Sequence, residues 1–225
     1  MGTGLLAFLS APVVFAAEVV QWSPLLAAAT VLTPLGVLFI AKPTIGAAMF
    51  AARPSWWAVA GAVLLLAVSF ALEPHWITGW RAALATQREV HAHVYPYIAP
   101  VTQPGVVLAL ACLLRWRRPE ARMVAVLACV PQTPMMYEIV PLMLVPRTTG
   151  EAGLLFGLSY VAMMIVAVEA TPWPWRIALL LLYLPATLMV LRRPNEGPVP
   201  AWLERRIVRW PLSLRGARVR QTAEG

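Results

Sequence analysis

Lys42 and Pro43 stand side by side in the apolar stretch FIAKPTIGAAMF, and Lys42 is the only lysine of the 225 residues. Counted back from Arg53, Lys42 lies roughly 16 Å along a helix, near the middle of a hydrocarbon layer about 30 Å thick. An ammonium group at that depth costs roughly 2.5–3.5 kcal/mol. Pro43 is a favourable first residue for a new helix, and helix N-termini bind anions. We therefore expect Lys42 and Thr44 to bind a phosphate group. The alternative is that Lys42 extends to the membrane interface or pairs with a glutamate, and that Pro43 only kinks the helix.

A second polar group interrupts a later apolar segment, where VPQTPMMYE contains two prolines and a glutamate. A proline costs about 3 kcal/mol in a helix interior. We predict two half-helices, Arg122–Val130 and Met136–Val145, that meet at a turn inside the membrane region. Irregular backbone at that depth must lie against protein or a water-filled cavity, so the turn should line a cavity. Tyr137 and Glu138 belong to this turn and are candidate binding residues, and an equal alternative is that Glu138 neutralises Lys42 or an arginine inside the bundle.

The composition predicts a membrane protein. The chain is 60% hydrophobic and 12% charged, with a mean hydropathy of +0.71, whereas a soluble domain is about 45–50% apolar and about 25% charged. The predicted fold is all-α, a polytopic bundle of about six full spans plus the pair of half-helices. The net charge of +8 is carried almost wholly by arginine, which indicates membrane topology and anionic lipid rather than nucleic acid.

The organisation along the chain follows from the apolar segments. Residues 1–191 are predicted to form the membrane bundle, with an outward loop at 73–97, and residues 192–225 a basic cytoplasmic tail on anionic lipid. The apolar segments are Gly4–Ala17, Leu25–Ala52, Trp56–Leu72, Ile98–Leu114, Met123–Val145, Leu154–Val168 and Trp175–Leu191.

The arginines support the half-helices. If the segment around Glu138 crossed the membrane once, the cluster at 115–122 and the basic tail would lie on opposite sides. With a re-entrant pair, Arg53, the 115–122 cluster, Arg147 and the tail all lie in the cytoplasm, as the positive-inside rule requires. Both termini are then cytoplasmic.

The outward loop contains all three histidines of the chain. Arg81, His91 and His93 are candidates to bind a donor phosphate or an acceptor sugar. No third ligand completes a metal site with the H-x-H pair, so no metal is predicted. The alternative for this loop is an amphipathic helix on the membrane surface over 76–90, with tryptophans as interfacial anchors.

One stretch, VQWSPLLAAATVLTPLGVLFIAKP, resembles a segment of the polyprenol-phosphate-mannose-dependent mannosyltransferase family, which has the glycosyltransferase-C superfold. In that family a Gly-Gln pair opens a helix that ends in Lys-Pro. Here Gln21 keeps the glutamine and Val20 replaces the glycine. The later TPMMYE is similar to a Ser-Pro turn followed by Tyr-Asp, with Glu138 in place of the aspartate. The resemblance covers approximately residues 20–145.

The resemblance implies an enzyme of the bacterial inner (plasma) membrane that transfers a sugar from a polyprenyl-phosphate donor to an acceptor hydroxyl on the outer face, without a cofactor. Lys42 and Thr44 would bind the donor phosphate, and Gln21, Tyr137 and Glu138 the substrate. The family's catalytic base is an acidic residue, usually aspartate, in an early external loop. This chain has no aspartate, so the catalytic residue is unassigned.

Two alternatives therefore stay open. The acid would come from a missing N-terminal half or a partner chain, or the protein is an inactive scaffold or lipid-phosphate-binding pseudoenzyme. A small transporter is a third, less favoured class, because mid-membrane charges and broken helices occur there too.

Overall fold

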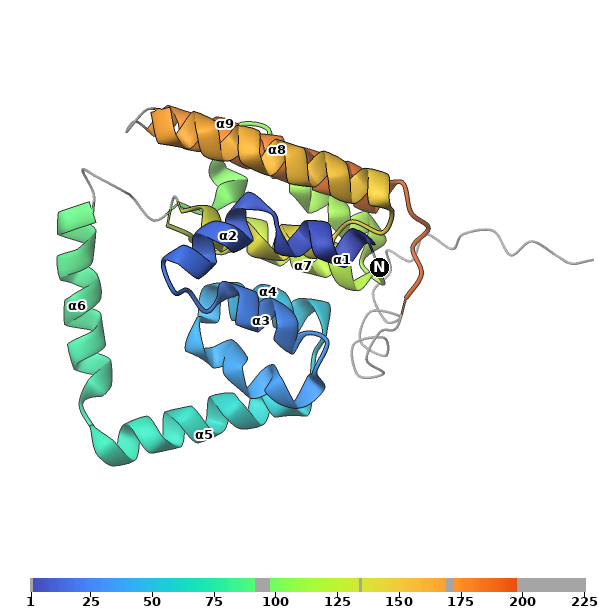
Figure 1. Cartoon of the computed structure of the whole chain (residues 1–225). Coiled ribbons are helices and arrows are strands. Elements are labelled where there is room, and N and C mark those ends of the chain that lie inside the picture. The colour runs from blue at the N-terminus through green and yellow to red at the C-terminus, as the bar shows by residue number, and fades with distance from the viewer. Residues whose placement is uncertain (1, 92–97, 134, 169–171, 198–225) are drawn as a thin grey trace, which may run out of the picture.

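A computed structural model describes residues 2–91, 98–133, 135–168 and 172–197 (Figure 1). Over these ranges the chain is helical and contains no β-strand, which confirms the predicted all-α class. The α-helices are α1 Gly2–Phe8, α2 Ala11–Glu18, α3 Ser23–Ala29, α4 Pro43–Ala52, α5 Trp56–Leu72, α6 Trp76–His91, α7 Pro119–Cys129, α8 Thr149–Val168 and α9 Pro172–Leu191. The 3-10 helices are η1 Thr33–Ala41, η2 Pro100–Thr102, η3 Val106–Arg115 and η4 Met136–Leu144.

One helix in the described part of the chain, α8, is long and apolar enough to cross a membrane. Two bent pairs, α2 with α3 and α5 with α6, raise the number to three if each pair counts as one span. Helices with the length and composition of a membrane span are thus present as expected, while the number of six full spans stays a prediction.

The apolar segment Leu25–Ala52 differs from a continuous span. It is divided among α3, η1 and α4, and each of the three begins with a proline at its first or second position. Proline lacks a backbone N–H and cannot continue a helix, but its fixed φ suits a helix start. The three prolines therefore set where this part of the chain changes direction.

The segment Gly4–Ala17 is also broken, into α1 and α2, and α8 satisfies the backbone at the break. The N–H of Ala11 donates to Ser159 Oγ at 3.1 Å, and Tyr160 Oη donates to the carbonyl of Leu9 at 2.8 Å. Ser159 and Tyr160 lie halfway along α8, so the break sits near mid-membrane if α8 spans the bilayer. Polar side chains of a neighbouring helix are what allows a broken helix at that depth.

Replacing Ser159 with alanine should therefore destabilise the protein by about 1–2 kcal/mol, because the Ala11 N–H loses its buried acceptor. The measurement is thermal unfolding of the purified protein in detergent. Ser69→Ala on α5 is the matched control, since the Ser69 hydroxyl has no interhelical partner among the residues described, and it should leave the unfolding midpoint unchanged. Equal midpoints for the two variants would contradict a role for Ser159 at the break.

The predicted pair of half-helices is present as α7 and η4, separated by an irregular turn. The chain leaves and returns to the same end of the bundle, because Glu120 at the start of α7 pairs with Arg147, just after η4, at 3.3 Å. The two half-helices thus form a hairpin, and the position of this hairpin within a membrane stays a prediction.

The same end of the bundle contains most of the arginines in the described part of the chain, and we call it the basic end. Glu120 is buried and also pairs with Arg118 at 3.2 Å and Arg193 at 3.0 Å. Arg122 donates to the carbonyls of Ala51 at 2.7 Å and Ala52 at 3.0 Å, the last residues of α4. A cation on the last carbonyls of a helix satisfies groups that have no intrahelical partner and complements the helix dipole. The C-terminus of α4 is thereby fixed at the basic end.

Glu120 should make stability depend on pH. Burial raises the pKa of its carboxyl group, but its backbone hydrogen bond and the charges of Arg147, Arg193 and Arg118 together lower the pKa below the ordinary 4.5. The folded state thus binds the proton more weakly than the unfolded state, so the stabilisation is complete above pH 4.5 and is lost as the pH falls through the lowered pKa.

Glu120→Gln should accordingly unfold more easily by about 1–3 kcal/mol at neutral pH, because hydrogen bonds to the charged carboxylate are lost. The difference from the unsubstituted protein should shrink below pH 4.5. Unfolding in detergent at a series of pH values measures this. A difference that is the same at pH 7 and at acidic pH would show that Glu120 contributes nothing through its charge.

Helices α5 and α6 form an L-shaped arm beside the bundle (Figure 1). α5 packs closely on η1, where Gly61 lies against the backbone of Val37. The axes of α5 and α6 are bent by 99°. α6 confirms the helix expected in the outward loop, and residues 92–97 of that loop lie outside the described residues. Of the predicted basic tail, only residues 192–197 are described.

Candidate functional site

Lys42 lies at the junction between η1 and α4, and its side chain forms an ion pair across to η4. α4 begins at Pro43, as the sequence predicts, and the Lys42 carbonyl accepts the N–H of Gly46 at 2.8 Å in the first helical turn. Lys42 Nζ lies 3.0 Å from Glu138 Oε1, with side-chain exposures of 17% and 5%. The lysine and glutamate that the sequence places 96 positions apart thus form one largely buried pair.

Tyr137 covers the ammonium group. Lys42 Nζ lies 4.1 Å from the centroid of the Tyr137 ring, within range of a cation–π interaction. The far side of the ring stacks on Phe15 of α2, with 6.1 Å between centroids and 6° between planes. Because cation–π attraction is worth about 2 kcal/mol or more when the cation is desolvated, Tyr137 offsets part of the cost of placing Lys42 here.

Glu138 uses only one of its two carboxylate oxygens. Oε1 accepts both from Lys42 and from Thr133 Oγ1, the latter at 3.1 Å. Oε2 is buried and has no hydrogen-bond partner in the described part of the chain, and the same holds for Thr44 Oγ1 beside the lysine. Buried polar atoms nearly always have partners, so each of these two atoms retains the capacity to accept a further hydrogen bond.

Gln132 and Tyr183 anchor the turn that carries Glu138, and sequence reasoning gave neither a role. Gln132 Nε2 donates to the carbonyl of Leu127 at 2.6 Å and to Tyr183 Oη at 3.3 Å, and its backbone forms an antiparallel bridge with Ile98. Both side chains are almost completely buried. A glutamine between two prolines in an apolar segment was a usable signal for Gln132, whereas Tyr183 sits in the apolar run of α9 with no such signal.

The remaining predicted site residues are not joined to the Lys42–Glu138 pair. Gln21 follows α2, where its N–H donates to the carbonyl of Ala16 at 2.8 Å, and its side chain is half-buried. Arg81 is exposed on α6, which packs extensively against none of the elements carrying the pair (Figure 1). His91 ends α6 but its side chain is not described, and His93 lies outside the described residues.

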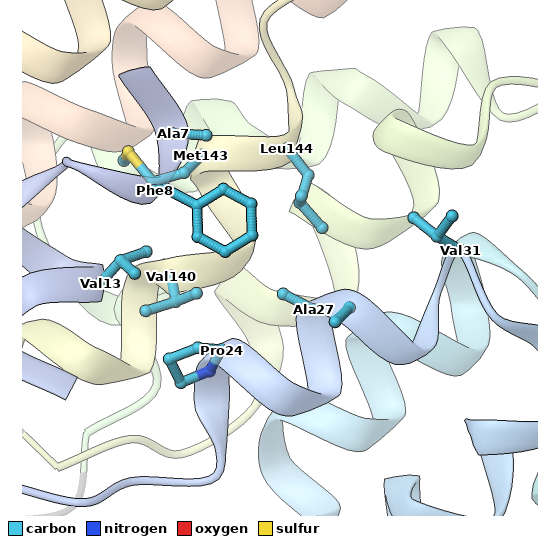
Figure 2. A pocket seen from close by; sticks show the side chains of 10 residues that line it. Ala7, Phe8, Val13, Pro24, Ala27, Val31, Val140, Met143 and Leu144 are labelled. Atoms are coloured by element: carbon cyan, nitrogen blue, oxygen red, sulfur yellow. The ribbon is translucent and has the colours of Figure 1, made fainter. Parts of the chain in front are cut away.

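An apolar pocket lies beside this polar cluster, between α1, α2, α3 and η4 (Figure 2). Its volume is about 130 Å³, and its lining is Ala7, Phe8, Val13, Pro24, Ala27, Ala28, Val31, Val140, Met143 and Leu144. Val13 and Tyr137 pack against the same small buried cluster of Ala16, Ala27 and Val140. The pocket and the Lys42–Glu138 pair are therefore adjacent, on opposite sides of Tyr137 and its packing partners.

No family model, curated protein or solved structure matches the chain.

Proposed function

We propose that the protein is a glycosyltransferase-like membrane protein that binds a polyprenyl-phosphate-linked sugar at the Lys42–Glu138 pair. The observation that carries the proposal is the pair itself, with a cation and an unpartnered carboxylate oxygen side by side. A sugar phosphate presents the complementary groups, an anion and neighbouring hydroxyls. Lys42 would bind the phosphate, while Glu138 Oε2 would accept a sugar hydroxyl.

The two groups divide the chemistry of sugar transfer. In that reaction the bond between the anomeric carbon and the phosphate oxygen breaks, and a bond from the acceptor oxygen to the same carbon forms. The lipid phosphate departs with the extra negative charge, which a cation beside it stabilises. The acceptor hydroxyl gives its proton to a base, and no residue of this chain is assigned that role.

The apolar pocket supports a lipid-linked rather than a free sugar phosphate. Its lining is apolar side chains, and a dry apolar cavity of about 150 Å³ accommodates a benzene-sized group. Tyr137 packs against Ala27 and Val140, which line the pocket, so a hydrocarbon chain in the pocket would bring its phosphate toward Lys42.

The finer architecture belongs to the same proposal. It comprises six full spans with the α7–η4 pair between them, as in part of a glycosyltransferase-C fold, in the plasma membrane of a bacterium. The basic end would face the cytoplasm and contact anionic lipid. From Pro43 to the basic end α4 is roughly 15 Å long, which would place Lys42 near the middle of the bilayer.

A second candidate is binding without turnover. The chain contains no aspartate, and Glu138, the carboxylate nearest to Lys42, is already engaged by Lys42 and Thr133. The protein would then hold the lipid phosphate as a pseudoenzyme or scaffold, or a partner chain would supply the base.

Binding and transfer assays with the protein in liposomes distinguish these candidates. The probe is a radiolabelled polyprenyl-phosphate mannose, with transfer to a mannoside acceptor as a second readout. The Lys42→Met/Glu138→Met double variant should lose binding, while Arg81→Ala, which removes a charge far from the pair, should retain it. Transfer by the purified chain supports the enzyme, and binding without transfer supports the pseudoenzyme. Unchanged binding by the double variant would overturn the phosphate site.

A further inference from the structure

We infer that α6 lies flat in the outer interface of the lipid bilayer, with its tryptophan face in the acyl region and Arg81 at the headgroups. The inference does not depend on the proposed activity. It rests on the angle between α5 and α6, on which face of α6 is apolar, and on where the arm lies relative to the basic end.

α5 fixes the direction of the membrane for the arm. Its 17 residues are apolar except for Ser69, and only Ala58 and Gly61 are buried, while one side of the helix packs on η1. At 1.5 Å per residue it is roughly 25 Å long, close to the thickness of the hydrocarbon layer. An apolar helix that protein covers on one side only is typical of a membrane span. α6 turns 99° away from it, so when α5 spans the bilayer, α6 runs parallel to the membrane plane.

The two faces of α6 differ in polarity. Trp76, Trp80 and Leu84 are spaced four residues apart and share one face. Arg81 lies at the edge of this face, about 100° from Trp80 and about 60° from Leu84, whereas Ala82 lies about 160° from both Trp80 and Leu84, on the opposite face. Trp76 contacts Phe70 of α5 at 5.8 Å and Trp80 at 6.4 Å between ring centroids, so the tryptophan face lies on the inner side of the bend between α5 and α6. Trp80 is 55% exposed.

The direction of α5 also determines on which side of the membrane α6 lies. α5 starts just after Arg53, whose guanidinium donates to the carbonyl of Thr30 at 2.6 Å, and Arg53 directly follows the α4 residues that Arg122 holds at the basic end. α5 therefore leads away from the basic end, and α6 lies at the opposite end of the molecule (Figure 1). Tryptophan is the residue that anchors helices at membrane interfaces, and amphipathic helices bury their apolar face by about 5–10 Å there.

Spin labels on α6 test this inference, in protein whose Cys112 and Cys129 are replaced by alanine and which is reconstituted in phosphatidylcholine–phosphatidylglycerol vesicles. Labels are placed singly at Trp80→Cys, Leu84→Cys and Ala82→Cys, with Leu64→Cys on α5 as the hydrocarbon-core reference. Power saturation then compares collisions with oxygen, which partitions into lipid, and with a water-soluble nickel chelate.

The labels at positions 80 and 84 should collide more with oxygen than with the nickel chelate, approaching the Leu64 reference, whereas the label at 82 should show the reverse. The Leu84 variant keeps both tryptophans, so it reports on α6 even if Trp80→Cys weakens anchoring. Equal collision ratios at positions 82 and 84 would overturn the inference. So would a label at 84 that is inaccessible to both reagents, because that result would mean α6 is covered by protein.

Discussion

Replacing Glu138 with methionine is expected to destabilise the protein by about 3–5 kcal/mol, because it leaves the Lys42 ammonium group buried without a counter-ion. Glu138 is 5% exposed and Lys42 17%, so water replaces little of the lost interaction. Tyr137 still faces the ammonium group, and cation–π attraction is too weak to compensate for the missing carboxylate.

Removing both charges together should be far less harmful. Apolar side chains of similar volume often replace a buried ion pair at no cost, since the desolvation of two charges disappears along with their attraction. The Lys42→Met/Glu138→Met double variant should therefore be nearly as stable as the unsubstituted protein, although each single variant is not. The coupling between the two sites is the measured quantity, from unfolding of all four proteins in detergent.

Additive effects of the two substitutions would contradict a direct interaction between Lys42 and Glu138. Glu138→Gln is a useful fifth protein, because it keeps the hydrogen bond from Thr133 Oγ1 while removing the charge. A Glu138→Gln variant as stable as the unsubstituted protein would show that hydrogen bonding, not charge, carries the interaction.

The double-mutant cycle at Lys42 and Glu138 also tests whether the pair has a functional role. If the double variant folds normally, the pair is not needed for stability, and its presence in an apolar region must be explained by binding or chemistry. A phosphate that binds Lys42 must compete with Glu138, so a ligand that also donates a hydroxyl to the carboxylate binds at a smaller electrostatic cost than phosphate alone.

The parts of the fold that the sequence predicted correctly are those fixed by prolines and charges. The α7–η4 hairpin follows from prolines that no continuous helix tolerates, and its direction follows from arginines on both flanks. α6 follows from the helical spacing of its tryptophans. The ion pair between Lys42 and Glu138 was one of the alternative interpretations of these residues. It forms because a single lysine in an apolar segment needs a counter-ion.

The parts that were missed depend on contacts between distant segments. The break between α1 and α2 is stabilised by Ser159 and Tyr160, and no pattern near residue 10 reveals which hydroxyls will meet it. The break before η1 could have been predicted from Pro34, but a single proline in a long apolar segment is an ambiguous signal. The roles of Gln132 and Tyr183 depend on α9 packing against the turn.

Val20 has a backbone conformation that usually requires glycine. It lies at φ 52°, in the left-handed region, and follows the end of α2. The N–H of Gln21 closes that end on the carbonyl of Ala16. Glycine is the usual residue at such a position, because a side chain there costs roughly 1–2 kcal/mol. The geometry thus gives a physical reason for the glycine of the Gly-Gln pair, although this chain has valine.

Gly46→Ala is expected to destabilise the protein by about 3 kcal/mol or more, since the added methyl group has no space. A Cβ at position 46 would overlap the carbonyl oxygen of Phe39 and lie 2.7 Å from its carbonyl carbon. This is the carbonyl that Pro43 leaves without a helical N–H. Because the obstacle is backbone rather than a flexible side chain, η1 and α4 would have to move apart, and Lys42 lies between them.

Gly153→Ala on α8 is the matched control, because a Cβ there meets nothing within 4 Å. Alanine is the better helix former by about 1 kcal/mol, so this variant should be as stable as the unsubstituted protein or slightly more so. Thermal unfolding in detergent compares the two variants directly. If Gly46→Ala unfolds at the same temperature as Gly153→Ala, η1 and α4 do not approach as closely as described. If it unfolds lower, the Lys42→Met/Glu138→Met background should reduce the loss, because displacement of Lys42 then no longer separates an ion pair.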